Sequence, residues 1–165
     1  MNFLDTACQK GPFDDLEFGL CDDQSSPVAY VDTAEKNKWL ATVSNPKERD
    51  VIFTAIDKCV IKDGDARGRP RCDCMLTVGS ELYLIELKER DKAGWQSVAA
   101  EQLESTIKLM SESHGVEFLK EYNPKKAYIC NRNKHPFFKP EFNMKKRFYD
   151  EYQFRLYVQT LVKIP

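Results

Sequence analysis

Residues 71–89 constrain the fold of this chain more than any other segment, because they have the pattern of a β-hairpin with a defined register. Gly79-Ser80 at their centre is a two-residue turn with glycine in its first position, and such turns join antiparallel strands directly. This turn places Asp73 opposite Glu86. Residues opposed on one face of a hairpin have Cβ atoms roughly 5 Å apart. The sequence therefore predicts two carboxylates side by side.

Two carboxylates at this separation repel each other unless a cation lies between them. Lys88 is two residues beyond Glu86, so it lies on the same face of the strand. Two acids and a lysine grouped in this way can hold a divalent metal and an attacking water. The alternative is a solvated surface strand, in which a Glu-x-Lys pair contributes well under about 1 kcal/mol.

The residues around Glu86 argue against a solvated strand. Leu82, Tyr83, Leu84, Ile85 and Leu87 make the segment nearly continuously apolar, which is typical of a central strand covered on both faces. A charge in such a strand is costly without a partner or an ion. The sequence therefore favours a buried site.

Pro70-Arg71-Cys72-Asp73, followed by Glu86-Leu87-Lys88 and then a helix, resembles the PD-(D/E)xK nuclease superfamily, which has the restriction-endonuclease-like fold. The resemblance covers the central half of the chain. It implies an α/β domain with an αβββαβ core, in which helices flank a central mixed sheet. It also implies a metal-dependent nuclease.

By the same resemblance, each role in the site falls on a named residue. Asp73, Glu86 and the backbone carbonyl of Leu87 are expected to bind Mg²⁺ or Mn²⁺, and Lys88 is expected to orient or activate water. Many relatives carry a glutamine on the next helix, and Gln102 is the candidate here. Catalytic roles are therefore expected for Asp73, Glu86, Lys88 and Gln102.

The motif departs from the family pattern in two places. Relatives with a tyrosine one helical turn after the glutamine are not matched, because that position is Thr106. Arg71 and Cys72 also separate Pro70 from Asp73, where the family has a proline-aspartate pair. These departures leave the subfamily open.

The expected chemistry can be stated from physical requirements. Phosphodiester hydrolysis needs a nucleophile, stabilisation of charge on the phosphoryl oxygens and help for the leaving oxygen, and one or two Mg²⁺ ions supply all three. Mg²⁺ prefers oxygen ligands and retains waters, so two carboxylates and a carbonyl suffice. A nearby ammonium stabilises the developing charge. Histidine is not required, and His114 and His135 are interpreted as surface or structural residues.

Two helix starts are predicted before the hairpin. Asp32 and Glu35 have capping-box spacing for a helix through about Val43. Asn45-Pro46 is a second start, and apolar residues over 51–59 then lie along one helical face. The later expected elements are a strand around 59–62, the hairpin, a long amphipathic helix from Trp95 to near Gly115, a strand over 126–131, a helix over 140–152 and a terminal strand over 154–164.

The resemblance also leaves a third metal-binding carboxylate open. Some relatives carry one on the helix that precedes the hairpin. Glu48 and Asp57 both lie on the helix predicted there, and the spacing does not choose between them.

Length and composition indicate one domain over residues 1–165, since the chain can bury a real core but is short for two domains. Residues 1–30 are expected to be an irregular acidic segment, because Gly11-Pro12, Asp14-Asp15 and Ser25-Ser26-Pro27 are loop signals. No apolar run is long enough to span a bilayer, and the N-terminus lacks a basic leader. We therefore expect no membrane association and a cytoplasmic location.

The six cysteines lack the CxxC pairs typical of zinc sites. Cys72 and Cys74 alternate with Asp73, so they are predicted to be buried, reduced thiols on the face opposite it. A zinc cluster of Cys59, Cys72, Cys74 and Cys130 is the alternative.

Charge is distributed unevenly along the chain. Residues 1–50 carry five basic and ten acidic groups, whereas residues 116–165 carry eleven and five. Basic side chains contact phosphates, and aromatic rings stack on unpaired bases. The alternative is that the aromatic residues form core and the lysines solvate the outer face. The basic third contains Lys125, Lys126, Arg132, Lys134, Lys139, Lys145, Lys146 and Arg147, interleaved with Tyr122, Tyr128, Phe137, Phe138, Phe142 and Phe148.

Two functions follow from these patterns. The first is a Mg²⁺-dependent nuclease, acting on DNA in the leading interpretation and serving a prokaryotic or mobile-element defence system. Its expected nucleic-acid contacts are Arg67, Arg69, Arg71, Lys125 and Lys126. The alternative is a non-catalytic domain of the same fold that binds a protein, such as an immunity protein that neutralises a toxin. In that case the acidic N-terminal third is the expected contact surface.

Overall fold

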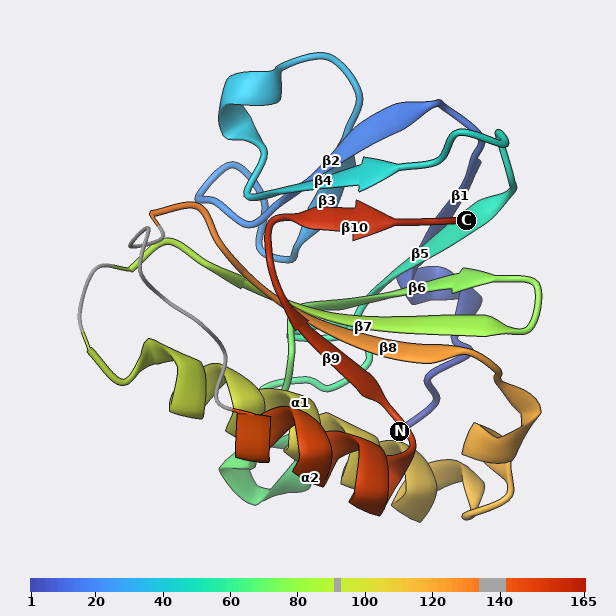
Figure 1. Cartoon of the computed structure of the whole chain (residues 1–165), viewed down its shortest axis with the longest axis vertical. Coiled ribbons are helices and arrows are strands. Elements are labelled where there is room, and N and C mark those ends of the chain that lie inside the picture. The colour runs from blue at the N-terminus through green and yellow to red at the C-terminus, as the bar shows by residue number, and fades with distance from the viewer. Residues whose placement is uncertain (91–92, 134–141) are drawn as a thin grey trace.

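The computed structural model describes residues 1–90, 93–133 and 142–165. In these residues the chain is α/β and has three layers (Figure 1): two helices cover one face of a six-stranded sheet, and a four-stranded sheet covers the other. The strands are β1 (Gln9–Phe13), β2 (Glu17–Cys21), β3 (Tyr30–Asp32), β4 (Ala41–Ser44), β5 (Val51–Ala55), β6 (Cys74–Val78), β7 (Glu81–Lys88), β8 (Lys125–Asn131), β9 (Arg155–Val158) and β10 (Leu161–Lys163). The helices are α1 (Trp95–His114) and α2 (Phe142–Tyr152).

The six-stranded sheet is mixed and has the order β1-β5-β6-β7-β8-β9. Strands β5, β6 and β7 form an antiparallel meander, and β7, β8 and β9 run parallel. Helix α1 is the crossover that the parallel pair β7 and β8 requires. The four-stranded sheet has the order β10-β4-β2-β3, in which only β10 and β4 are parallel neighbours.

The predicted hairpin register is confirmed. Val78 pairs with Glu81 across the Gly79-Ser80 turn, and the ladder continues to Cys74 opposite Ile85. Gly79 has a φ of +56°, a backbone conformation that favours glycine. Asp73 precedes β6 and lies outside this ladder, so the predicted strand pairing of Asp73 with Glu86 does not form. The Asp73 side chain instead meets β7 at the backbone N–H of Leu87.

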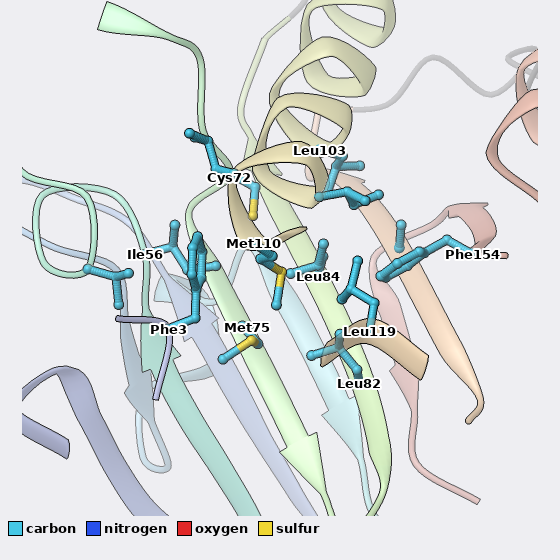
Figure 2. Close-up of a cluster of buried hydrophobic side chains, with 14 of the residues drawn as sticks. Phe3, Ile56, Cys72, Met75, Leu82, Leu84, Leu103, Met110, Leu119 and Phe154 are labelled. Atoms are coloured by element: carbon cyan, nitrogen blue, oxygen red, sulfur yellow. The ribbon is translucent and has the colours of Figure 1, made fainter. Parts of the chain in front are cut away.

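Alternation along β7 explains its apolar sequence. Leu82 and Leu84 face the helices, where Figure 2 shows them among side chains of α1 and neighbouring segments. Tyr83 and Ile85 point the other way and pack between the two sheets. Because β7 is covered on both faces, nearly every position in it is apolar.

The N-terminal third differs from the prediction. The segment over 1–30 is not irregular, since it contains β1 and β2, and neither predicted helix before the hairpin forms in the described residues. The capping signals are real but local: Asp32 accepts hydrogen bonds from the backbone N–H groups of Ala34 and Glu35, yet only the short 3₁₀ helix Lys36–Lys38 follows. Asn45 likewise closes a loop, through hydrogen bonds with the backbone of Arg49.

Strand β5 takes the place of the predicted second helix because it pairs with β1 on one side and β6 on the other. The first strand of the meander is therefore β5, and residues 59–62, predicted as that strand, lie mainly in a turn with one isolated bridge between Asp57 and Ile61. The order β5-β6-β7-α1-β8 matches the expected core without its leading helix.

The C-terminal half agrees more closely. The long helix is confirmed as α1, which ends before Gly115, and the strand over 126–131 is confirmed as β8. The predicted helix over 140–152 corresponds to α2, although residues 140 and 141 lie outside the described residues. The predicted terminal strand is divided into β9 and β10, which belong to different sheets. Across the described ranges, no helix has the length and apolar character needed to cross a membrane.

The cysteines correct a second expectation. Cys8 and Cys59 form a disulfide, which removes Cys59 from the alternative zinc cluster, while Cys21, Cys72, Cys74 and Cys130 are free and buried. Cys72 and Cys74 are buried as predicted but do not share a face. Because β6 begins only at Cys74, the chain bends before it, and Cys72 packs on the helix side while Cys74 packs between the sheets.

Candidate active site

Three elements bring the predicted catalytic residues together at one end of the six-stranded sheet. Lys88 Nζ lies 2.5 Å from Glu86 Oε1 and donates a hydrogen bond to Gln102 Oε1 on α1 at 2.6 Å. Asp73 Oδ2 accepts a hydrogen bond from the backbone N–H of Leu87 at 2.6 Å. The hairpin and α1 therefore assemble all four predicted catalytic residues into one group.

This group is deeply buried. Asp73 is 8% exposed, Glu86 1% and Lys88 9%. Burial raises the pKa of Asp73 to about 7, against the hydrogen bond from Leu87, and the charge of Asp22 adds to the rise. Burial and the charge of Asp73 also raise the pKa of Glu86 well above its ordinary value, although Lys88 opposes them. Without a further cation, the site disfavours two ionised carboxylates.

Glu86 also has an unused acceptor. Its Oε1 pairs with Lys88, but its buried Oε2 has no hydrogen-bond partner. Leaving such an oxygen unpaired costs about 1–3 kcal/mol, more for a charged group. The N–H and C=O of one strand residue point to the same side, so the Leu87 N–H that meets Asp73 implies that the Leu87 carbonyl also faces it. Oxygens of Glu86, Asp73 and Leu87 thus suit a hard cation such as Mg²⁺.

Neither candidate for the third carboxylate lies on a helix. Glu48 is in the loop between β4 and β5, and Asp57 follows β5. Asp57 is close enough to raise the pKa of Asp73, but Arg71 Nε lies 2.6 Å from its Oδ1. Within residues 1–90, 93–133 and 142–165, no three Asp, Glu, His or Cys side chains gather closely enough to hold an ion by themselves. A bound metal would therefore depend on backbone oxygen and water as well.

Asp22 is an acidic neighbour of Asp73 and Glu86 that the sequence analysis did not predict. It follows β2 in the four-stranded sheet, and its charge raises the pKa values of both Asp73 and Glu86. The pKa of Asp22 is itself raised, by partial burial and then by the charge of Asp57. No local signal marks this residue, because its position depends on how two sheets pack.

The arginines of the loop before the hairpin are not equally available to a substrate. Arg71 forms ion pairs with Asp57 and Asp63, and Arg69 forms one with Glu112. Arg67 is exposed and has no ion pair in the described part of the chain. Of the three predicted phosphate contacts, Arg67 is the one with an uncommitted charge.

Lys125 and Lys126 lie at the opposite end of the sheet. Lys125 pairs with Leu82 in the β7–β8 register, whereas Lys88 pairs with Asn131. Six residues of strand separate the two positions, which is roughly 20 Å at about 3.3 Å per residue. The predicted contacts at Lys125 and Lys126 therefore do not belong to the group around Lys88.

Two further predictions concern the histidines and the basic and aromatic residues of the C-terminal third. His114 is structural, as predicted, since its Nε2 accepts a hydrogen bond from the backbone N–H of Phe3. The predicted roles of Lys134, His135, Phe137, Phe138 and Lys139 fall on residues outside the described ranges.

Comparison of the chain with protein-family models, curated proteins and solved structures finds no match. The PD-(D/E)xK resemblance therefore stays a prediction, which depends on the residues of the hairpin and on the topology around them.

Proposed function

We propose that this protein is a Mg²⁺- or Mn²⁺-dependent nuclease that hydrolyses phosphodiester bonds, with DNA as the first substrate to test. The observation that carries the proposal is the buried group of Asp73, Glu86 and Lys88, in which an acceptor oxygen of Glu86 is unpaired. Structural ion pairs are satisfied by their partners. This group instead joins two acids to one lysine, which is an arrangement suited to a further cation.

Each residue has a role that follows from its contacts. Asp73, Glu86 and the Leu87 carbonyl would hold the metal, which when bound would supply Lewis-acid activation and neutralise phosphoryl charge. Lys88 presents an ammonium beside the metal-binding acids and would stabilise negative charge that develops during attack. Gln102 holds that ammonium through its Oε1 and anchors the Arg71 carbonyl through its Nε2, at 3.0 Å.

The proposal is tested by cleavage assays on linear double-stranded DNA, single-stranded DNA and RNA with Mg²⁺, Mn²⁺ or chelator. Lys88→Ala is expected to lower a metal-dependent rate on the order of a hundredfold. Lys163→Ala is the matched control, because Lys163 is an exposed lysine on β10. Folding of each variant is checked by urea unfolding, since loss of Lys88 leaves Glu86 buried without its ion-pair partner.

The catalytic proposal fails if wild type and Lys88→Ala are both inert on every substrate, or if both keep the same residual activity. It also fails if chelator leaves the rate of the wild type unchanged. Loss of activity that follows unfolding of Lys88→Ala would be recognised in the urea experiment and separated from a loss of catalysis.

A protein-binding role is the second candidate, and the four-stranded sheet favours it. The loops of this sheet carry exposed acids, and Leu16, which precedes β2, is 60% exposed. A partner with a basic surface, such as a toxin, would complement them. These acids are Asp14, Asp15, Asp22, Asp23 and Glu35. A toxin gene beside the gene for this chain, together with cleavage assays that detect no activity, would favour this role.

The cytoplasmic location of the protein also stays a prediction.

A further inference from the structure

Thr106 on α1 is a fully buried threonine whose hydroxyl group joins two segments of the chain. Its Oγ1 accepts a hydrogen bond from the backbone N–H of Cys72 at 2.8 Å and donates one to the backbone carbonyl of Gln102 at 2.8 Å. A hydroxyl group has one proton to donate, so the bond to Gln102 leaves the oxygen lone pairs directed away from the helix backbone. The orientation of the hydroxyl group is thus fixed for Cys72.

Gln102 lies one helical turn before Thr106 and faces the same segment. Its Nε2 donates to the Arg71 carbonyl, so two consecutive turns of α1 hold two consecutive residues, Arg71 and Cys72. Asp73 follows immediately, before the β6 ladder begins at Cys74. The backbone that carries Asp73 is therefore fixed by side chains of α1 as well as by strand pairing.

The position of this backbone decides where the Asp73 carboxylate lies. Metal ligands must be held within about 0.5 Å of their productive positions, and the groups that hold them typically matter tenfold to a hundredfold in metal affinity. We propose that Thr106 is a positioning residue of the metal site: through the N–H of Cys72 it places Asp73 relative to Glu86 and Lys88. This inference rests on the proposed metal-dependent function.

The test compares Thr106→Val and Thr106→Ser with a control at Thr54. Thr54 is also fully buried, but its Oγ1 has no hydrogen-bond partner, so Thr54→Val makes the same chemical change without breaking a bond. Mn²⁺ affinity is measured by titration on the folded full chain, and stability by urea unfolding in chelator. Thr106→Val is expected to bind Mn²⁺ about ten to a hundred times more weakly, and Thr106→Ser within about threefold of wild type. Thr54→Val should bind as wild type does.

A merely structural threonine would give a different result. If Thr106→Val loses stability but binds Mn²⁺ with the affinity of the wild type, the positioning role is overturned and the proposed function is unaffected. If Thr106→Val does not fold, Thr106→Ala removes the same hydroxyl group with no added methyl group and is judged by the same criterion. A wild type that binds no Mn²⁺ overturns both the proposed function and this inference, and is recognised before any variant is examined.

Discussion

The two glutamates of β7 have opposite environments although one strand carries both. At the turn end, Glu81 lies 2.6 Å from Arg49 and accepts a hydrogen bond from the Tyr83 hydroxyl group at 2.5 Å. Burial raises its pKa, but these two partners outweigh burial and leave the pKa of Glu81 below its ordinary value. At the open end, Glu86 has one lysine, a second acid beside it and an oxygen without a partner.

This difference distinguishes Glu81, a charge that stabilises the fold, from Glu86, a charge that is available to bind a cation. Each oxygen of Glu81 has a partner within the protein, so removing its charge should damage the fold. Glu86 is more buried and less satisfied, so its ionised form is costly until another cation arrives.

The largest difference is expected in activity. Glu86→Gln should lower the metal-dependent cleavage rate by a hundredfold or more, roughly the loss seen when one preorganised electrostatic group is removed from an active site. Glu81→Gln should keep the rate of the wild type, measured well below its unfolding midpoint, because Glu81 lies at the opposite end of β7 from Lys88 and Glu86 is untouched. Equal losses in the two variants would contradict the assignment of the open end as the active site.

Metal binding should stabilise the folded protein, and this gain should depend on Glu86 and not on Glu81. At a metal concentration one hundred times its Kd, binding to the folded state alone adds about 2.7 kcal/mol to the free energy of unfolding. Wild type and Glu81→Gln should both show this gain in urea unfolding with Mn²⁺, and Glu86→Gln should not. A gain of the same size in Glu86→Gln would place the metal elsewhere.

In chelator the order of stability should reverse. Glu81→Gln loses charge-assisted hydrogen bonds to Arg49 and Tyr83, so its free energy of unfolding should fall by about 1–2 kcal/mol at pH 7. Glu86→Gln breaks the ion pair with Lys88 but also removes the repulsion between Glu86 and Asp73, and Lys88 keeps its hydrogen bond to Gln102. Its free energy of unfolding should therefore fall less than that of Glu81→Gln. If Glu86→Gln is the less stable of the two without metal, Glu86 is a structural charge.

The sequence predicted the open end better than its surroundings for a physical reason. The turn at Gly79-Ser80 and the alternation beside it are local, and they determine the register up to Cys74 opposite Ile85, which leaves Asp73 beside the end of β7 at Leu87. The positions of Lys88 and Gln102 then follow from strand and helix geometry. The parts of the site that depend only on local strand and helix geometry could therefore be predicted from the sequence.

The N-terminal third could not be predicted because its structure depends on distant contacts. The apolar residues over 51–59 fit a helical face, but Val51, Phe53 and Ala55 also alternate as a strand, and pairing with β1 and β6 selects the strand. Asp22 reaches the site through the packing of the four-stranded sheet, and Cys8 meets Cys59 across 51 residues of chain. No local pattern determines these contacts.

The dependence of stability on pH is expected to have opposite signs at the two ends. The folded pKa of Asp73 is about 7, above its unfolded value of about 3.9, so between these pH values the folded state binds a proton that the unfolded state has released. The stability of the metal-free protein should therefore fall as pH rises from 5 to 7, by less than about 1.4 kcal/mol for each proton and pH unit.

Glu86, whose pKa is also raised, acts in the same direction, whereas Glu81, whose pKa is lowered, loses its contribution only as pH falls through the acid range. Urea unfolding in chelator at pH 5, 6 and 7 measures the slope. Asp73→Asn should make the decline shallower, because the asparagine does not titrate, and Glu81→Gln should leave the slope unchanged. If Glu81→Gln abolishes the decline in stability between pH 5 and 7 and Asp73→Asn preserves it, the pH dependence arises from Glu81 and not from the buried acids beside Lys88.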